Sequence, residues 1–115
     1  MLSFTSNNPS SLLNAFDAAI AKGTGTGSII TWRKVDGYYT HTSTQWGGEA
    51  YFKASVAVGQ LRFNIIRPNN KNITVTAYGY YHGHLIETFL NHFDKSFSAV
   101  SATPTCVSGD VCQAA

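Results

Sequence analysis

The dipeptide Asp36-Gly37 constrains the fold of this chain more than any other feature, because it lies between two runs of strand-forming residues. Asp-Gly is favoured in the two-residue turns of antiparallel hairpins, where the backbone needs a positive φ. We therefore expect residues 29–35 and 38–43 to form a hairpin. In the register that this turn imposes, Trp32 lies opposite His41, on a large aromatic face that should pack against the core.

A second turn signal, Pro68 to Asn72, separates two further runs. Residues 50–67 are predicted to form one long bent strand, in which the apolar positions change phase after Gly59 as they do at a β-bulge. Residues 73–82 are predicted to return antiparallel to it, because the two apolar faces match in that pairing. The middle of the chain thus predicts four antiparallel strands.

Helical patterns flank these strands. Residues 9–22 carry their apolar side chains on one stripe, with Asn8 as a cap, Pro9 at the first helical position and Gly23 as a stop. A second apolar stripe, at three- and four-residue steps, predicts a helix over residues 84–99. The sequence therefore predicts an α+β two-layer sandwich in the order α-β-β-β-β-α, with two helices on one face of a four-stranded antiparallel sheet.

Length and composition fit one globular domain. The chain has 115 residues, of which 43% are hydrophobic and 12% are charged, so it can bury a core while its surface is polar but mostly neutral. We assign residues 1–100 to a single α+β domain and residues 101–115 to a loosely ordered C-terminal tail. A net charge of +2 without a run of Lys and Arg argues against a nucleic acid partner.

The apolar runs are too short to cross a membrane, which takes roughly 20 residues, so we expect no membrane partner. Residues 1–6 lack the basic region and the long apolar stretch of a signal peptide. This favours a cytoplasmic protein. A mature exported domain is the alternative, because the charged fraction is low.

Two cysteines, Cys106 and Cys112, lie in the tail. They are either unpaired thiols, which is the simplest interpretation, or partners in a small disulfide loop of an oxidising compartment. A metal or redox role is the third alternative, although two thiols are too few for a structural zinc site without histidines.

The segment from His82 to Glu87 comes nearest to a metal-binding pattern. His82, His84 and Glu87 are ligand types that suit zinc or iron, and His84 and Glu87 share one face of the predicted helix. Their spacing differs from His-Glu-x-x-His, and the histidines can equally be turn residues where a strand meets a helix. We find no nucleophile motif or acid–base pair. We therefore lean toward a protein that is not an enzyme and that has no cofactor.

The polar face of the predicted sheet is the most suggestive feature for function. Tyr78, Tyr80 and His82 alternate on it beside Arg62, and they should point away from the helices. Trp46 lies in a loop, where it either contacts a partner or folds back over the core. Tyrosine and arginine often dominate binding energies, although the same residue types also occur on solvated strands.

We therefore expect a small binding domain that engages a protein partner, or a second copy of itself in a homodimer, through this polar and aromatic sheet face. The alternative is a small enzyme or ligand-binding protein with a His/Glu site at residues 82–87.

Overall fold

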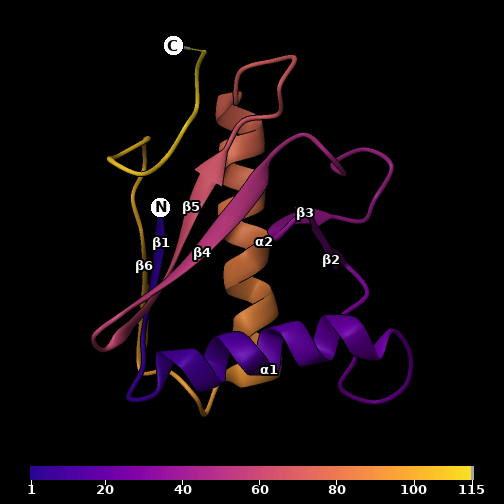
Figure 1. The fold of residues 1–115 in the computed structure, drawn as a ribbon, viewed down its shortest axis with the longest axis vertical. Helices are drawn as coiled ribbons and strands as arrows, with labels where there is room; N and C mark the ends of the chain where they lie inside the picture. The colour runs from indigo at the N-terminus through magenta and orange to yellow at the C-terminus, as the bar shows by residue number, and fades with distance from the viewer. Residues whose placement is uncertain (115) are drawn as a thin grey trace.

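A computed structural model describes residues 1–114 of the chain. Its elements follow in the order β-α-β-β-β-β-α-β: β1 Leu2–Thr5, α1 Pro9–Lys22, β2 Trp32–Val35, β3 Tyr38–His41, β4 Tyr51–Ala57, β5 Gln60–Ile66, α2 Val75–Phe93 and β6 Ala99–Ala102. The strands form one sheet in the order β2-β3-β4-β5-β1-β6, and neighbouring strands are antiparallel (Figure 1).

The α+β class is confirmed, but the predicted α-β-β-β-β-α order and the four-stranded sheet are wrong. The described residues form a six-stranded sheet, because β1 pairs with β5 on one side and with β6 on the other. Each of these two added strands has only four residues. Four residues carry too little alternation to be recognised as a strand, and their pairing joins parts of the chain that are far apart in sequence.

The first hairpin is confirmed in detail. Trp32 lies opposite His41, and the turn residues Asp36 and Gly37 have φ values of 51° and 84°. A positive φ at both positions is what the Asp-Gly sequence accommodates. The first helix is confirmed as well, because the Asn8 side chain accepts a hydrogen bond of 3.2 Å from the backbone N–H of Ser11.

The predicted single strand over residues 50–67 is wrong, and so is the predicted bulge. Val58 and Gly59 form a two-residue turn between β4 and β5, so that Ala57 lies opposite Gln60. Gly59 has a φ of 74°, which glycine adopts without strain. A bulge and a tight turn both change the phase of apolar residues by one position, and the local pattern does not separate them.

The predicted strand over residues 73–82 is also wrong, since α2 begins at Val75. The Thr74 hydroxyl caps it by accepting a hydrogen bond of 3.0 Å from the N–H of Ala77. Tyr and Thr gave this segment the composition of a strand. Tertiary packing decides otherwise, because Tyr81, Leu85 and Phe89 follow at four-residue steps and all three are fully buried. The helix predicted over residues 84–99 is therefore displaced and ends at Phe93.

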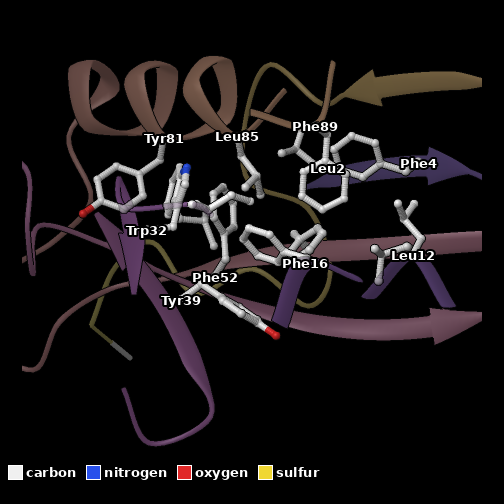
Figure 2. Packing of buried hydrophobic residues seen from close by; sticks show 14 of the residues in the cluster. Leu2, Phe4, Leu12, Phe16, Trp32, Tyr39, Phe52, Tyr81, Leu85 and Phe89 are labelled. Carbon is white, nitrogen blue, oxygen red and sulfur yellow. The ribbon is translucent and has the colours of Figure 1, made fainter. Parts of the chain in front are cut away.

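One hydrophobic core lies between the helices and a single face of the sheet. In Figure 1 α2 runs behind β4 and β5, and α1 crosses near its lower end. Phe63 of β5 contacts both helices, with its ring centroid 5.9 Å from Phe16 of α1 and 5.7 Å from Phe89 of α2. Phe4 of β1 stacks on Phe89 at 4.3 Å. Figure 2 shows Phe4, Phe16 and Phe89 packed between α2 and the strands. Each large apolar side chain buried in this way contributes about 1.5–3 kcal/mol.

Neither α1 nor α2, the helices of the described residues, is long and apolar enough to span a membrane.

Candidate functional site

The predicted site residues fall into separate places. Tyr78, Tyr80 and His82 lie on α2 rather than on a strand, while Arg62 lies on β5. The predicted orientation of the two tyrosines away from the helices is therefore wrong. Tyr78 is buried beside the tail, and Tyr80 is half-buried against the loop after β3. The structure does not bring them together with Arg62.

Trp46 packs against the core, as the core-capping alternative predicts. Its ring stacks on Tyr80 with a centroid distance of 4.3 Å and an interplanar angle of 10°. The Tyr80 hydroxyl lies 3.4 Å from Nε2 of His41, and the Tyr81 hydroxyl donates to the backbone carbonyl of Trp46. These contacts fix the loop between β3 and β4 over the start of α2.

His84 belongs to this aromatic cluster. Its ring stacks on Trp32 at 5.5 Å and lies 4.6 Å from the His41 ring. Burial lowers the pKa of His41, and the neighbouring His84 lowers it further. Glu87 Oε1 is 3.7 Å from His84 Nε2. This cluster is a packed aromatic contact with the Glu87 carboxylate at its rim.

His82 is on a different side of α2, so His82, His84 and Glu87 do not converge. Among residues 1–114 no three His, Cys, Asp or Glu side chains are placed to hold a metal ion together. The structure thus offers no geometric support for the metal site that the segment suggested.

His82 instead lies in a buried polar cluster that the sequence did not indicate. Its Nδ1 is 2.7 Å from the backbone carbonyl of Tyr78, to which it donates, and its Nε2 accepts from the Met1 ammonium at 3.1 Å. The same ammonium also lies 3.1 Å from the Tyr78 hydroxyl, 2.8 Å from Thr103 Oγ1 and 3.1 Å from Asp110 Oδ2, so its three N–H groups are shared among four acceptors. Both nitrogens of His82 are thus engaged by its neutral form.

Burial lowers the pKa of His82 to about 4, and the nearby Met1 ammonium acts in the same direction. For Asp110, burial alone would raise the pKa. Hydrogen bonds from Val107 N and Asn64 Nδ2, together with the Met1 ammonium, outweigh burial and hold the pKa below its usual value. The Asp110 carboxylate is therefore charged and its side chain is completely buried. The only sign of this cluster in the sequence is that Asp110 lies between Cys106 and Cys112.

The second candidate region is the sheet face opposite the helices, which we call the open face. It follows from strand alternation, since Phe52, Leu61 and Phe63 are fully buried and their neighbours point the other way. Its members are Ser3, Thr5, Arg33, Val35, Tyr38, Tyr51, Lys53, Ser55, Gln60, Arg62, Asn64 and Ile66. Arg62 is the one predicted binding residue that lies here.

A hollow of about 330 Å³ lies at one end of the open face. Tyr38, Tyr51 and Ile66 line it, together with Val35 and Pro68. Tyr38 is 37% exposed. The Arg67 guanidinium at its edge donates to the backbone carbonyls of residues 69 and 71. The hollow is thus an aromatic and aliphatic surface on a rigid sheet.

Comparison of the chain with protein-family models, curated proteins and solved structures finds no match.

Proposed function

We propose that this chain is a small non-enzymatic binding domain that engages a protein partner through its open face. The observation that carries the proposal is the combination of a sheet covered by helices on one side only with an aromatic hollow on the other. An exposed apolar patch on a small domain usually marks an interaction site. The aromatic residues of the open face are Tyr38 and Tyr51, and not Tyr78 and Tyr80 as the sequence predicted.

The rigidity of these two rings supports binding. Tyr38 lies in β3 next to the turn, and Tyr51 begins β4, so both backbones are held by strand pairing. Tyrosine offers a large contact area with few rotatable bonds, which limits the entropy lost on association. Tyr and Arg are also the residues that most often dominate the energy of protein interfaces.

The charge of the open face favours an acidic partner. Arg33, Lys53 and Arg62 all project from it. Two carboxylates from its surroundings are engaged elsewhere, because Asp17 pairs with Lys34 and Glu49 pairs with Lys71. Asp36, which is acidic, and Arg67, which is basic, both line the hollow. A symmetric contact between two open faces would bring these basic side chains near one another, which opposes self-association through this surface.

The test is a selection of short random peptides on the immobilised protein. The double variant Tyr38→Ser/Tyr51→Ser serves for counter-selection, and Leu90→Ser on α2, which is 51% exposed, is the matched control away from the open face. We expect acidic peptides that bind the native chain and the control but not the double variant. Thermal unfolding of all three proteins checks that the fold is kept.

Light scattering on the same proteins separates the two kinds of partner. If the native chain is a dimer and the double variant is a monomer, the partner of the open face is a second copy of the chain and not an acidic protein. Peptides that bind the double variant as tightly as the native chain would refute the role of the hollow.

A further inference from the structure

The disulfide-closed segment of residues 106–112, which we call the strap, occupies a free strand edge. β1 pairs with β5 only as far as Phe63, opposite Leu2, so the rest of β5 extends past the start of β1. The strap lies beside this extension. Val111 N donates to Ile65 O at 2.8 Å, and Arg67 N donates to Val111 O at 2.7 Å. The bridge between Ile66 and Val111 is parallel. The strap therefore covers backbone groups that β1 leaves unpaired.

The Asp110 carboxylate fastens the strap to β5. Its Oδ1 accepts hydrogen bonds from Asn64 Nδ2 at 2.9 Å and from Ile65 N at 3.1 Å. Its Oδ2 accepts from Val107 N at 3.0 Å, within the strap itself. A charged acceptor with several donors forms strong contacts when water is excluded. Docking of the strap thus depends on Asp110 and Val107 having a fixed relative geometry.

The disulfide supplies that geometry. Cys106 and Cys112 are bonded at a sequence separation of 6 and enclose both Val107 and Asp110. The carbonyl of Cys112 also accepts from Ile73 N at 2.8 Å, which ties the ring to the segment before α2. Opening the ring would let its residues explore many more conformations, and few of them present Asp110 and Val111 to β5 together.

We propose that the strap is a redox-sensitive cover over the free end of β5. A dithiol reductant transfers two electrons and two protons to Cys106 and Cys112. Their S–S bond breaks into two thiols while the reductant closes its own disulfide. The strap then undocks more often, and the backbone groups of β5 at residues 64–67 that it covers become exposed.

A second surface changes with the strap. A hollow of about 430 Å³ lies between the strap and the start of α2, and its lining includes Ile73, Val75, Tyr78 and both cysteines. Because the disulfide is part of the wall, opening the strap removes that wall. The exposure of Ile73 and Tyr78 to solvent then rises, so the state of the disulfide controls both this hollow and the edge of β5.

The size of the effect follows from the ring. For a disulfide closing a loop with a sequence separation of 6, the chain-entropy relation gives up to about a 50-fold change in the docking equilibrium. Amide hydrogen exchange that proceeds through local opening reports this equilibrium directly. The amides to follow are those of Arg67, Ile73 and Val111, since each donates across the boundary between strap and body.

The experiment compares these three amides by NMR in the full chain before and after reduction with dithiothreitol, with alkylation and mass measurement to establish that both thiols are free. We expect exchange at the three amides to rise by up to about 50-fold. Amides of the hairpin of β2 and β3 are the internal control and should not change.

The double variant Cys106→Ser/Cys112→Ser should reproduce the reduced state. If that variant does not fold, titration of the native chain with reductant tests the proposal by itself. Unchanged exchange at all three amides in the fully reduced chain would overturn the proposal. So would an equal rise across the whole sheet, because the ring would then stabilise the entire fold and not the strap.

Discussion

Acidification should destabilise this protein through His82, well above the pH at which most carboxylates titrate. The histidine is 4% exposed, and its folded-state pKa of about 4 lies below its ordinary value of 6.5. A depressed histidine pKa means that the unfolded chain binds the proton more readily. The free energy of unfolding is therefore highest above pH 6.5 and falls as the pH drops toward 4.

The magnitude follows from the two pKa values. Between about pH 7 and pH 5 the difference in proton binding amounts to about 2 kcal/mol, and it reaches about 3 kcal/mol near pH 4. The main physical source is the burial of the ring, which disfavours its charged form, and the Met1 ammonium adds to it. A protonated ring would bring a second positive charge next to the Met1 ammonium, and Nε2 would stop accepting its hydrogen bond.

Urea unfolding followed by tryptophan fluorescence measures this dependence. The native chain should lose about 2 kcal/mol between pH 7 and pH 5. The variant His82→Gln should lose much less over the same range, whatever its stability at pH 7. His92→Gln is the matched control, because His92 lies exposed near the end of the same helix. If His82→Gln retained the full pH dependence of the native chain, the assignment of the effect to His82 would be wrong.

Three further substitutions probe the fold and the strap. Phe63→Ala removes the ring that both helices contact and should lower the unfolding free energy by about 3–5 kcal/mol in urea titrations; a loss under 1 kcal/mol would show that the core is not centred there. Asp110→Ala leaves Asn64, Ile65 and Val107 without their acceptor. It should accelerate amide exchange of Val111 even in the oxidised protein, and unchanged exchange would mean that the backbone bonds alone hold the strap. Thr74→Ala removes the cap of α2 and should lower the melting temperature by the equivalent of about 1 kcal/mol, an effect that Thr76→Ala, exposed two residues later, should not share.

Local signals in the sequence predicted local structure well. Asp36-Gly37 specified both a turn and its register, and Asn8 with Pro9 specified where α1 begins. Each of these signals acts within a few residues, so no knowledge of the rest of the fold is needed. The core face of β5 was also predicted, because Leu61, Phe63 and Ile65 alternate strictly and all three are buried.

The errors arose where distant parts of the chain decide the outcome. Residues 73–82 have the composition of a strand, but the capping of Thr74 and the packing of Tyr81 against Trp32 make them helical. β1 and β6 were missed because each has only four residues, and their pairing joins parts of the chain that are far apart in sequence.

The candidate site was predicted only in outline. The expectation of an exposed polar and aromatic sheet face led to Arg62, and the strand assignment then determined which tyrosines were chosen. The prediction paired residues 60–67 with residues 73–82, whereas β5 pairs with β4. The tyrosine that lies beside β5 on this face is therefore Tyr51, and not Tyr78 or Tyr80. The polar cluster around Asp110 could not be predicted, because it joins Met1, Thr103 and Asp110 to Tyr78 and His82 in the first half of α2.

The position of β1 between β5 and β6 has a consequence for folding during synthesis (Figure 1). Leu2 lies opposite Ala102, and Met1 O accepts from Thr103 N at 3.0 Å, so strands that are far apart in the sequence are neighbours in the sheet. A growing chain cannot complete this sheet until Ala102 has left the ribosome, and contacts of such long separation form slowly. Although β1 precedes the other strands of this sheet in the sequence, it is thus among the last of them to gain both of its neighbours.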